Sequence, residues 1–242
     1  MNIPSEQDSK TDPSGEQILE RCAKTYLAVS EYVGECVVNS HSTSSSNEAL
    51  PKSGSRTAQA HFDFKRGTCF NIQGHLTNDT PFSIESSPTN TILKNQVRGQ
   101  EHSEECENLI RAVAAMTGVA ATAPTTILAL LTPARWGFPF RSGLVPCLKG
   151  HETIAGHDCF VVVQSSDTPA RVRTYWIDSQ SFLLRQMREE RGENSNDEVE
   201  ARRERHKTFN RERGLPDPTN YKIIESDTVH VFSIERVVLG VT

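Results

Sequence analysis

The stretch Arg171–Arg188, which reads RVRTYWIDSQSFLLRQMR, contains the clearest fold signal of the chain. Two runs rich in β-branched, aromatic and long apolar residues flank the short polar link Asp178–Ser181, a pattern typical of a β-hairpin. Asp178 suits the turn because its carboxylate can accept hydrogen bonds from backbone N–H groups just ahead of it. The sequence therefore predicts two antiparallel strands that are joined at Asp178.

The pairing register of this hairpin decides which side chains face the core. If Thr174 lies opposite Gln186 and Trp176 opposite Leu184, one face is apolar and holds Val172, Thr174, Trp176, Phe182 and Leu184. The other face then holds Arg171, Arg173, Arg185 and Glu189, with Tyr175, Ile177, Leu183 and Met187 among them. A slip of one residue would exchange the two faces, because strand side chains alternate.

Short strands recur on both sides of this hairpin. The cleanest alternation lies in Thr57–Arg66, which places Ala58, Ala60, Phe62 and Phe64 on one face. The expected strands, about eleven in all, are residues 32–39, 57–66, 69–75, 81–86, 91–97, 148–154, 158–164, 171–177, 182–188, 221–226 and 229–238. Strands at a spacing of roughly 8–12 residues predict an antiparallel meander rather than βαβ units.

A helix is expected to precede the strands. Either Asp12 caps it with Pro13 at the first helical position, or Ser14 caps it with Gln17 three residues on. Apolar residues then recur at helical spacing, at Ile18, Cys22 and Tyr26. This pattern predicts an amphipathic helix that packs one face against the rest of the protein.

A helical lid is expected at residues 103–132. Ser103 can cap its first helix, several glutamates follow at the positive end, and Gly118 can stop it. Pro124 starts a second, short helix, Thr125–Leu131, which is apolar almost all round and must be covered by protein or ligand. The aromatic segment Trp136–Phe140 extends this apolar region.

The remaining segments are expected to lie outside the core. Residues 1–11 are predicted to be a disordered lead-in, and residues 41–56 a Ser-rich exposed loop. Residues 189–213 are dense in charge and predict a solvated helix or loop inserted between strands. Residues 12–242 are expected to form a single domain, since 242 residues suffice to bury a core.

Composition excludes several function classes. A net charge of -5 gives no electrostatic case for nucleic acid or anionic lipid as a partner. No run of about 20 apolar residues could span a membrane. The N-terminus is polar and lacks the apolar core of a signal peptide. The protein is therefore expected either in the cytosol or, if a targeting segment has been removed, in the cell envelope.

No pattern of reactive residues indicates an enzyme or a metal site. His157, Asp158 and Cys159 are consecutive strand residues, so their side chains cannot converge. The chain has no Gly-x-Ser-x-Gly elbow, no glycine loop for phosphate and no helical histidine pair. None of its six cysteines belongs to a Cys-x-x-Cys pair. They are expected either to form disulfides or to be buried as small apolar side chains. We expect no catalytic residue, no metal and no cofactor.

Three segments resemble the periplasmic lipoprotein carrier (LolA/LolB-like) superfamily. They are the leading helix Ile18–Tyr26 running into Tyr32, the hairpin at residues 150–156, and the hairpin formed by residues 175–178 and 182–185. The resemblance covers roughly residues 12–238 and extends to outer-membrane lipoprotein-sorting homologues. It implies a strongly curved antiparallel sheet of about eleven strands, an incomplete barrel, with helices in its mouth as a lid. It also implies acyl chains or other lipophilic groups as ligands. The chain departs from the superfamily in its Ser-rich loop, its charged insertion and its cysteines.

These observations predict an α+β, mainly β fold and a non-enzymatic carrier that shelters a lipid, an acyl chain or a lipidated protein. We expect a monomer in the periplasm or cell envelope, with membrane-associated proteins as further partners. The candidate cavity residues are Phe62, Phe64, Ile127, Leu128, Leu131, Trp136, Phe138, Phe140, Trp176 and Phe182. The same side chains could instead pack together as a filled core. In that case the protein is an envelope sensor or interaction module, and a cavity enzyme is a third hypothesis.

Overall fold

The computed structural model describes residues 12–44, 53–75, 80–97, 99–115, 122–133, 140, 144–167, 170–191, 204, 207–208, 211 and 226–240. Within them the chain is mainly β, with three helices, α1 (Gly15–Ala28), α2 (Leu109–Ala115) and α3 (Thr122–Leu131). The strands are β1 (Glu31–Ser44), β2 (Ser53–Lys65), β3 (Cys69–His75), β4 (Pro81–Ser86), β5 (Thr91–Val97), β6 (Gln100–Cys106), β7 (Cys147–Ile154), β8 (His157–Asp167), β9 (Ala170–Asp178), β10 (Leu184–Arg191) and β11 (Ser226–Gly240). The predicted mainly β class with antiparallel pairing is confirmed.

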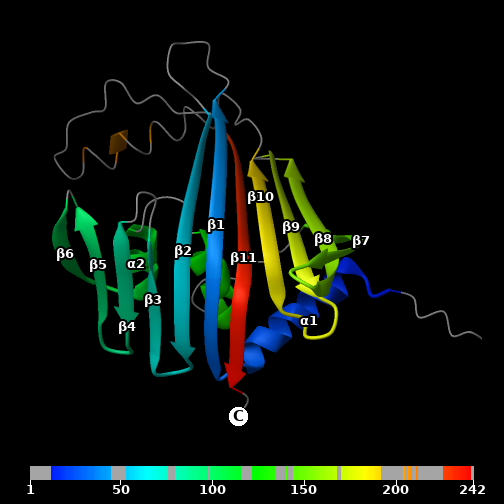
Figure 1. Ribbon diagram of the computed structural model, residues 1–242, viewed down its shortest axis with the longest axis horizontal. Helices are drawn as coiled ribbons and strands as arrows, with labels where there is room; N and C mark the ends of the chain where they lie inside the picture. The colour runs from blue at the N-terminus through cyan, green and yellow to red at the C-terminus, as the bar shows by residue number, and fades with distance from the viewer. Residues whose placement is uncertain are drawn as a thin grey trace, which may run out of the picture.

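Sequential neighbours pair in two antiparallel groups, β1 to β6 and β7 to β10 (Figure 1). The last strand, β11, pairs with both β1 and β10 and so joins the two groups in the order β6-β5-β4-β3-β2-β1-β11-β10-β9-β8-β7. The end strands β6 and β7 each have one neighbour in this order, so the sheet is open.

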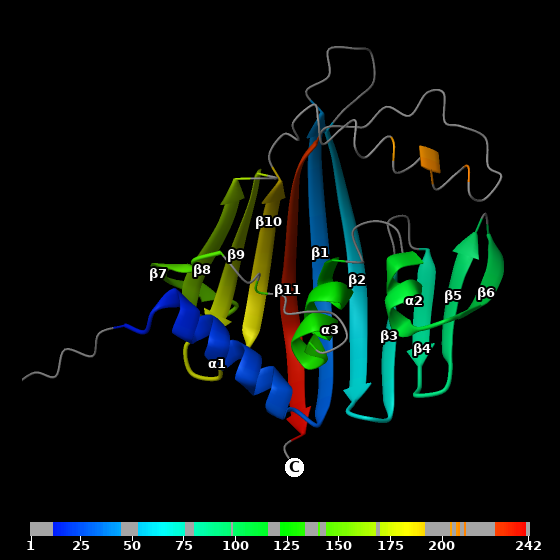
Figure 2. The same cartoon turned by 180° about the vertical axis from the view of Figure 1, so that it is seen from behind.

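The three helices lie on one face of the sheet (Figure 2). α1 crosses β7 and β8, α3 lies over β1 and β2, and α2 lies over β4, β5 and β6. Buried apolar residues of β1 to β5 and of β8 to β10 point toward the helices, and they form the main apolar cluster together with the helix stripes. We call this side the covered face. It includes Ala58, Ala60, Phe62 and Phe64, as the alternation in this strand predicts.

The second of the two predicted caps of α1 is correct. Ser14 Oγ accepts a hydrogen bond from Gln17 N at 3.2 Å, and Gln17 Oε1 accepts one from Ser14 N at 2.9 Å. This reciprocal capping box satisfies two donors that a helix N-terminus leaves free. The predicted stripe of Ile18, Cys22 and Tyr26 is fully buried against the sheet.

The prediction that Ser103 caps a helix was wrong. Residues 100–106 form β6, and six of the seven residues of this strand are exposed. Glutamates suit the first turn of a helix, but they also suit an edge strand, where charge blocks pairing with another chain. α2 begins only at Leu109, and the Asn108 side chain accepts a hydrogen bond from Arg111 N near its start.

The C-terminal predictions also need correction. β11 is continuous from Ser226 to Gly240, so the expected break before Val229 is absent, while residues 221–225 lie outside the described part. β10 continues to Arg191, and Glu189 is a buried strand residue rather than part of a solvated insertion. The predicted loop 41–56 was too long, because residues 41–44 belong to β1 and residues 53–56 to β2. Residues 1–11 and 45–52 lie outside the described residues, and of the rest of the insertion the structure describes only residues 204, 207–208 and 211.

The predicted register of the 171–188 hairpin was wrong, by one residue at Leu184 and by two residues at Gln186. Leu184 pairs with Ile177, and Gln186 pairs with Trp176, because the ladder shifts between Leu184 and Gln186. The tight turn ends at Phe182, whose φ is 55°, and the extra residue Arg185 then forms a bulge. The covered face therefore holds Tyr175, Ile177, Leu184 and Met187.

Candidate functional site

The covered face brings together most of the predicted cavity residues. Six of them are buried in the main apolar cluster, namely Phe62, Phe64, Ile127, Leu128, Leu131 and Phe140. Phe182 is partly buried against the same cluster. In this structure these side chains fill one another's space, so a guest between helices and sheet requires the helices to move.

The other three candidates lie elsewhere. Trp136 and Phe138 fall outside the described residues. Trp176 belongs to a second, small cluster with Cys159 and Val161, and its Nε1 donates a hydrogen bond to Glu152 Oε2 at 2.7 Å. Trp176 lies on the opposite face because it alternates along β9 with Tyr175 and Ile177, which belong to the covered face.

Helix α3 is apolar and buried on all sides. Every residue from Thr126 to Leu131 is at most 9% exposed. The helix ends at Leu131, and Thr132 Oγ1 donates back to the Leu128 carbonyl at 2.8 Å. No helix in the described part of the chain is long and apolar enough to cross a membrane. A helix that packs on a sheet needs only one apolar face, whereas α3 is apolar and buried on its other faces as well.

One arginine connects the helices to the sheet. Arg66 follows β2, and its guanidinium donates three hydrogen bonds to backbone carbonyls, to Val29 at 2.9 Å and to Tyr26 and Leu131 at 3.1 Å each. The last carbonyls of a helix lack partners within the helix, and Arg66 supplies such partners to the ends of both α1 and α3. We call this arrangement the Arg66 latch. Sequence reasoning missed it, because no spacing pattern connects an arginine after a strand with two distant helix ends.

Beside the latch, two tyrosines are buried with unpartnered hydroxyls. Tyr26 comes from the last turn of α1 and Tyr32 from the start of β1, and their ring centroids are 5.8 Å apart. Both side chains are 0% exposed, and neither hydroxyl makes a hydrogen bond. Burial raises the pKa of both phenols, so both remain protonated donors. The sequence showed them only as apolar positions of a stripe and a strand.

The turn between β9 and β10 shows the opposite arrangement. Asp178 is 5% exposed, and its Oδ1 accepts hydrogen bonds from Gln180 N at 3.0 Å and Ser181 N at 2.9 Å. Its Oδ2 accepts from Arg185 Nη2 and from His157 Nδ1, both at 2.9 Å. Burial raises the pKa of Asp178, but the N–H of Ser181, the Arg185 guanidinium and the N–H of Gln180 together lower it to about 2. The predicted turn role of Asp178 is confirmed.

A buried polar group also lies on the covered face of β8–β10. Arg173 Nε donates to Glu189 Oε2 at 2.6 Å, and Glu189 is 2% exposed. Next to them, the Tyr175 hydroxyl donates to Gln164 Oε1 at 3.3 Å. Burial lowers the pKa of Arg173, but the adjacent Glu189 carboxylate raises it above its ordinary value. This pair is internally neutral and offers no free charge to a ligand.

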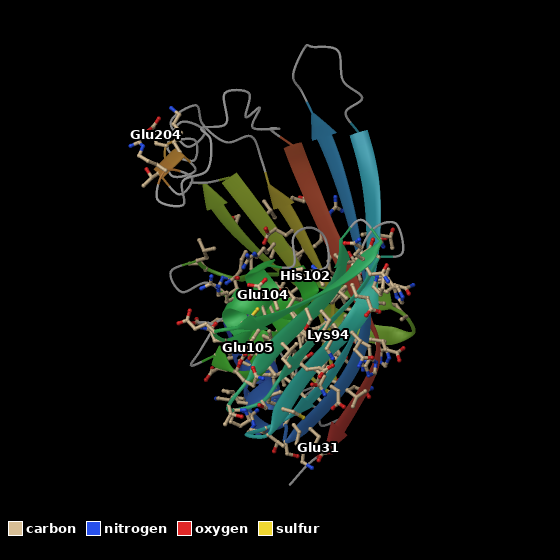
Figure 3. All side chains as sticks on the ribbon, turned by 90° about the vertical axis from the view of Figure 1, so that its left-hand side faces the viewer. Glu31, Lys94, His102, Glu104, Glu105 and Glu204 are labelled. Carbon is tan, nitrogen blue, oxygen red and sulfur yellow. The ribbon has the colours of Figure 1, made fainter. Side chains whose placement is uncertain are left out.

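The edge formed by β5 and β6 is polar and solvent-facing (Figure 3). Lys94, His102, Glu104 and Glu105 lie there, and a hollow of about 760 Å³ runs along the upper ends of β3–β6. Lys94 pairs with Glu85 at 2.8 Å, with both side chains about half exposed. Within the described part of the chain, no group of three histidine, cysteine or acidic residues could hold a metal ion. Charged edge strands prevent pairing with other chains, and this role accounts for the composition of β6.

The His157-Asp158-Cys159 sequence does not form a nucleophile with its base. His157 binds Asp178, while Cys159 Sγ donates to the His157 carbonyl at 3.5 Å. Burial raises the pKa of the Cys159 thiol to about 11, which keeps it protonated and unreactive at neutral pH.

Comparison with known proteins finds similarity among solved structures. No family model matches the chain, and no curated protein matches it. A LolA superfamily protein from Nitrosomonas europaea is 12% identical with a TM-score of 0.34, over 96% of this chain and 96% of that chain. A domain described as an outer membrane lipoprotein-sorting protein from Vibrio parahaemolyticus is 9% identical with a TM-score of 0.34, over 93% of each chain. A DUF1329 family protein from Desulfovibrio piger is 9% identical with a TM-score of 0.33, over 95% of this chain and 94% of that chain.

Proposed function

We propose that this protein is a non-enzymatic carrier that shelters a lipid, an acyl chain or a lipidated protein between the covered face of its sheet and helices α1 and α3. The observation that carries the proposal is the Arg66 latch, in which one side chain binds the ends of both helices. The apolar character of α3 supports it further, because a helix that leaves the sheet would expose a continuous apolar surface to a guest.

The structure corresponds to the closed state of such a carrier. A guest would replace contacts that α3 and α1 now make with Phe62, Phe64 and their neighbours. Each buried CH₂ group contributes roughly 0.8 kcal/mol, so a long acyl chain could offset the loss of those contacts. The latch itself resists opening only moderately, because water replaces its hydrogen bonds once the helices separate.

A carrier of this type is expected to act in the cell envelope, the periplasm included, where lipids and lipidated proteins cross between membranes. We propose that it works as a monomer and meets membrane-associated proteins that load or unload it. The formal net charge of -5 fits a guest held by apolar contact rather than by its head-group charge.

Uptake of a fluorescent fatty acid by purified, delipidated protein tests the proposal. We expect saturable uptake by the wild-type protein and faster uptake by Arg66→Leu, in which the latch is removed. Lys65→Ala is the matched control, because Lys65 forms only an exposed ion pair with Glu31 and should leave uptake unchanged. Native mass spectrometry of protein from its own host should show a lipid adduct. A folded protein with neither uptake nor adduct would contradict the proposal.

The second candidate is an envelope interaction or sensor module without a ligand. The mutual packing of the predicted cavity residues favours it, because a filled core needs no guest. The two functions separate in the same assay, since a module with a filled core takes up no probe even when Arg66→Leu frees the helices.

A further inference from the structure

The Tyr26–Tyr32 pair is an unexplained feature of the closed structure. Both hydroxyls are buried at the junction of α1, β1 and the latch, and neither has a partner. The backbone of Leu184 approaches the Tyr26 hydroxyl, and the two hydroxyls approach each other, without reaching hydrogen-bond geometry. A buried hydroxyl without a partner costs free energy that phenylalanine at the same place would not cost.

The local backbone supports this placement of Tyr32. The ring lies along β1 above Gly34, and a Cβ atom at Gly34 would stand 2.6 Å from the Tyr32 hydroxyl. Glycine inside a strand weakens the strand, and it often marks a place that another group must approach closely. Here it leaves room for a hydroxyl that the closed structure does not use.

We infer that Tyr26 and Tyr32 bind the acyl carbonyl of the guest, an ester or amide oxygen, by donating their two hydroxyl hydrogens to it. The inference rests on the proposed function and adds a polar end to the apolar site. A carbonyl oxygen has two lone pairs and can accept both donors. The hydrocarbon chain would then extend along the apolar cluster in which both rings take part.

The surrounding charges favour a neutral acceptor over an anionic head group. The Arg185 guanidinium lowers the pKa of both phenols by its charge, and it is already bound to Asp178. The guanidinium of Arg66 holds the carbonyl of Tyr26 itself, so release of the latch frees the same residue whose hydroxyl the guest would bind.

The experiment compares two lipids that differ in one carbonyl. Monooleoylglycerol and its ether analogue, 1-O-oleylglycerol, compete with a fluorescent fatty acid on the delipidated full chain. We expect the wild-type protein to bind the ester about ten-fold more tightly than the ether, and the Tyr32→Phe and Tyr26→Phe variants to lose that preference while still binding both. An N-palmitoyl peptide and its N-hexadecyl analogue repeat the comparison for a lipidated protein.

Tyr175→Phe is the matched control, because Tyr175 is equally buried but its hydroxyl already binds Gln164. It should keep the ester preference. Equal affinity of the wild-type protein for ester and ether would overturn the inference. So would an ester preference that survives in both the Tyr26→Phe and the Tyr32→Phe variants. Neither outcome would contradict the carrier function. Absence of binding to either lipid would instead refute the carrier function. If Tyr32→Phe lowers the free energy of unfolding as much as Tyr175→Phe does, the Tyr32 hydroxyl has a structural partner, such as a buried water. That result would also overturn the inference.

Discussion

The β9–β10 turn and the α1–β1 junction differ in whether their buried polar groups have hydrogen-bond partners. At the turn, both oxygens of Asp178 accept hydrogen bonds and its charge is paired with Arg185. At the junction, two hydroxyls are buried without partners, and the helix ends depend on Arg66. A fully satisfied network fixes one geometry, whereas an unsatisfied one is stabilised by any change that supplies a partner. The contrast predicts that the hairpin is a fixed frame and that the helices are the movable part.

Removal of the Asp178 carboxylate should give the largest effect. Asp178→Ala leaves the Arg185 guanidinium, which is 13% exposed, without its counter-ion and frees two backbone N–H groups. We expect the free energy of unfolding to fall by about 3 kcal/mol, as when one partner of a buried ion pair is lost. Denaturant titration measures the change. Glu85→Ala, which removes the half-exposed partner of Lys94, is the control and should cost less than about 1 kcal/mol.

The pH dependence of stability should report the same carboxylate. Its pKa is about 2 in the folded protein and 3.8 as the ordinary value, so the folded state favours the charged form. Stability from this group is therefore complete above about pH 4 and is lost as the pH falls toward 2, by about 2 kcal/mol in total. Unfolding curves between pH 5 and pH 2 test this expectation against Asp178→Asn, whose curve should be flatter by that amount. Identical slopes for the two proteins would contradict the fixed-frame assignment.

Loss of the Arg66 latch should change motion more than global stability. Arg66→Leu removes three hydrogen bonds to helix-end carbonyls, and we expect a loss of about 1–2 kcal/mol because water reaches the freed groups. Hydrogen exchange should accelerate in α1 and α3 and remain slow in the β9–β10 hairpin. Equal acceleration in both regions would remove the distinction between frame and lid. Lys65→Ala should change neither.

Local chemistry made three parts of the fold predictable from the sequence, namely the turn at Asp178, the start of α1 and the buried face of β2. Asp178 in a polar link, Ser14 with Gln17, and the alternation of Phe62 and Phe64 each indicate their structures within a few residues. The bulge at Arg185 was not predictable, because a single inserted residue leaves the apolar pattern intact while it shifts the pairing of β10 against β9. The latch and the tyrosine pair were missed for a related reason, since both depend on contacts between segments distant in the chain.

The smallest expected effect compares two tyrosine hydroxyls of equal burial. Tyr175→Phe removes a hydroxyl that donates to Gln164 and leaves this buried amide short of a partner, so about 1 kcal/mol of stability should be lost. Tyr32→Phe removes a hydroxyl without a partner, and stability should stay the same or rise slightly. Denaturant midpoints of the ligand-free variants measure the difference. Its sign matters more than its size, because an unused hydroxyl that is dispensable without a guest and required with one belongs to the binding site rather than to the core.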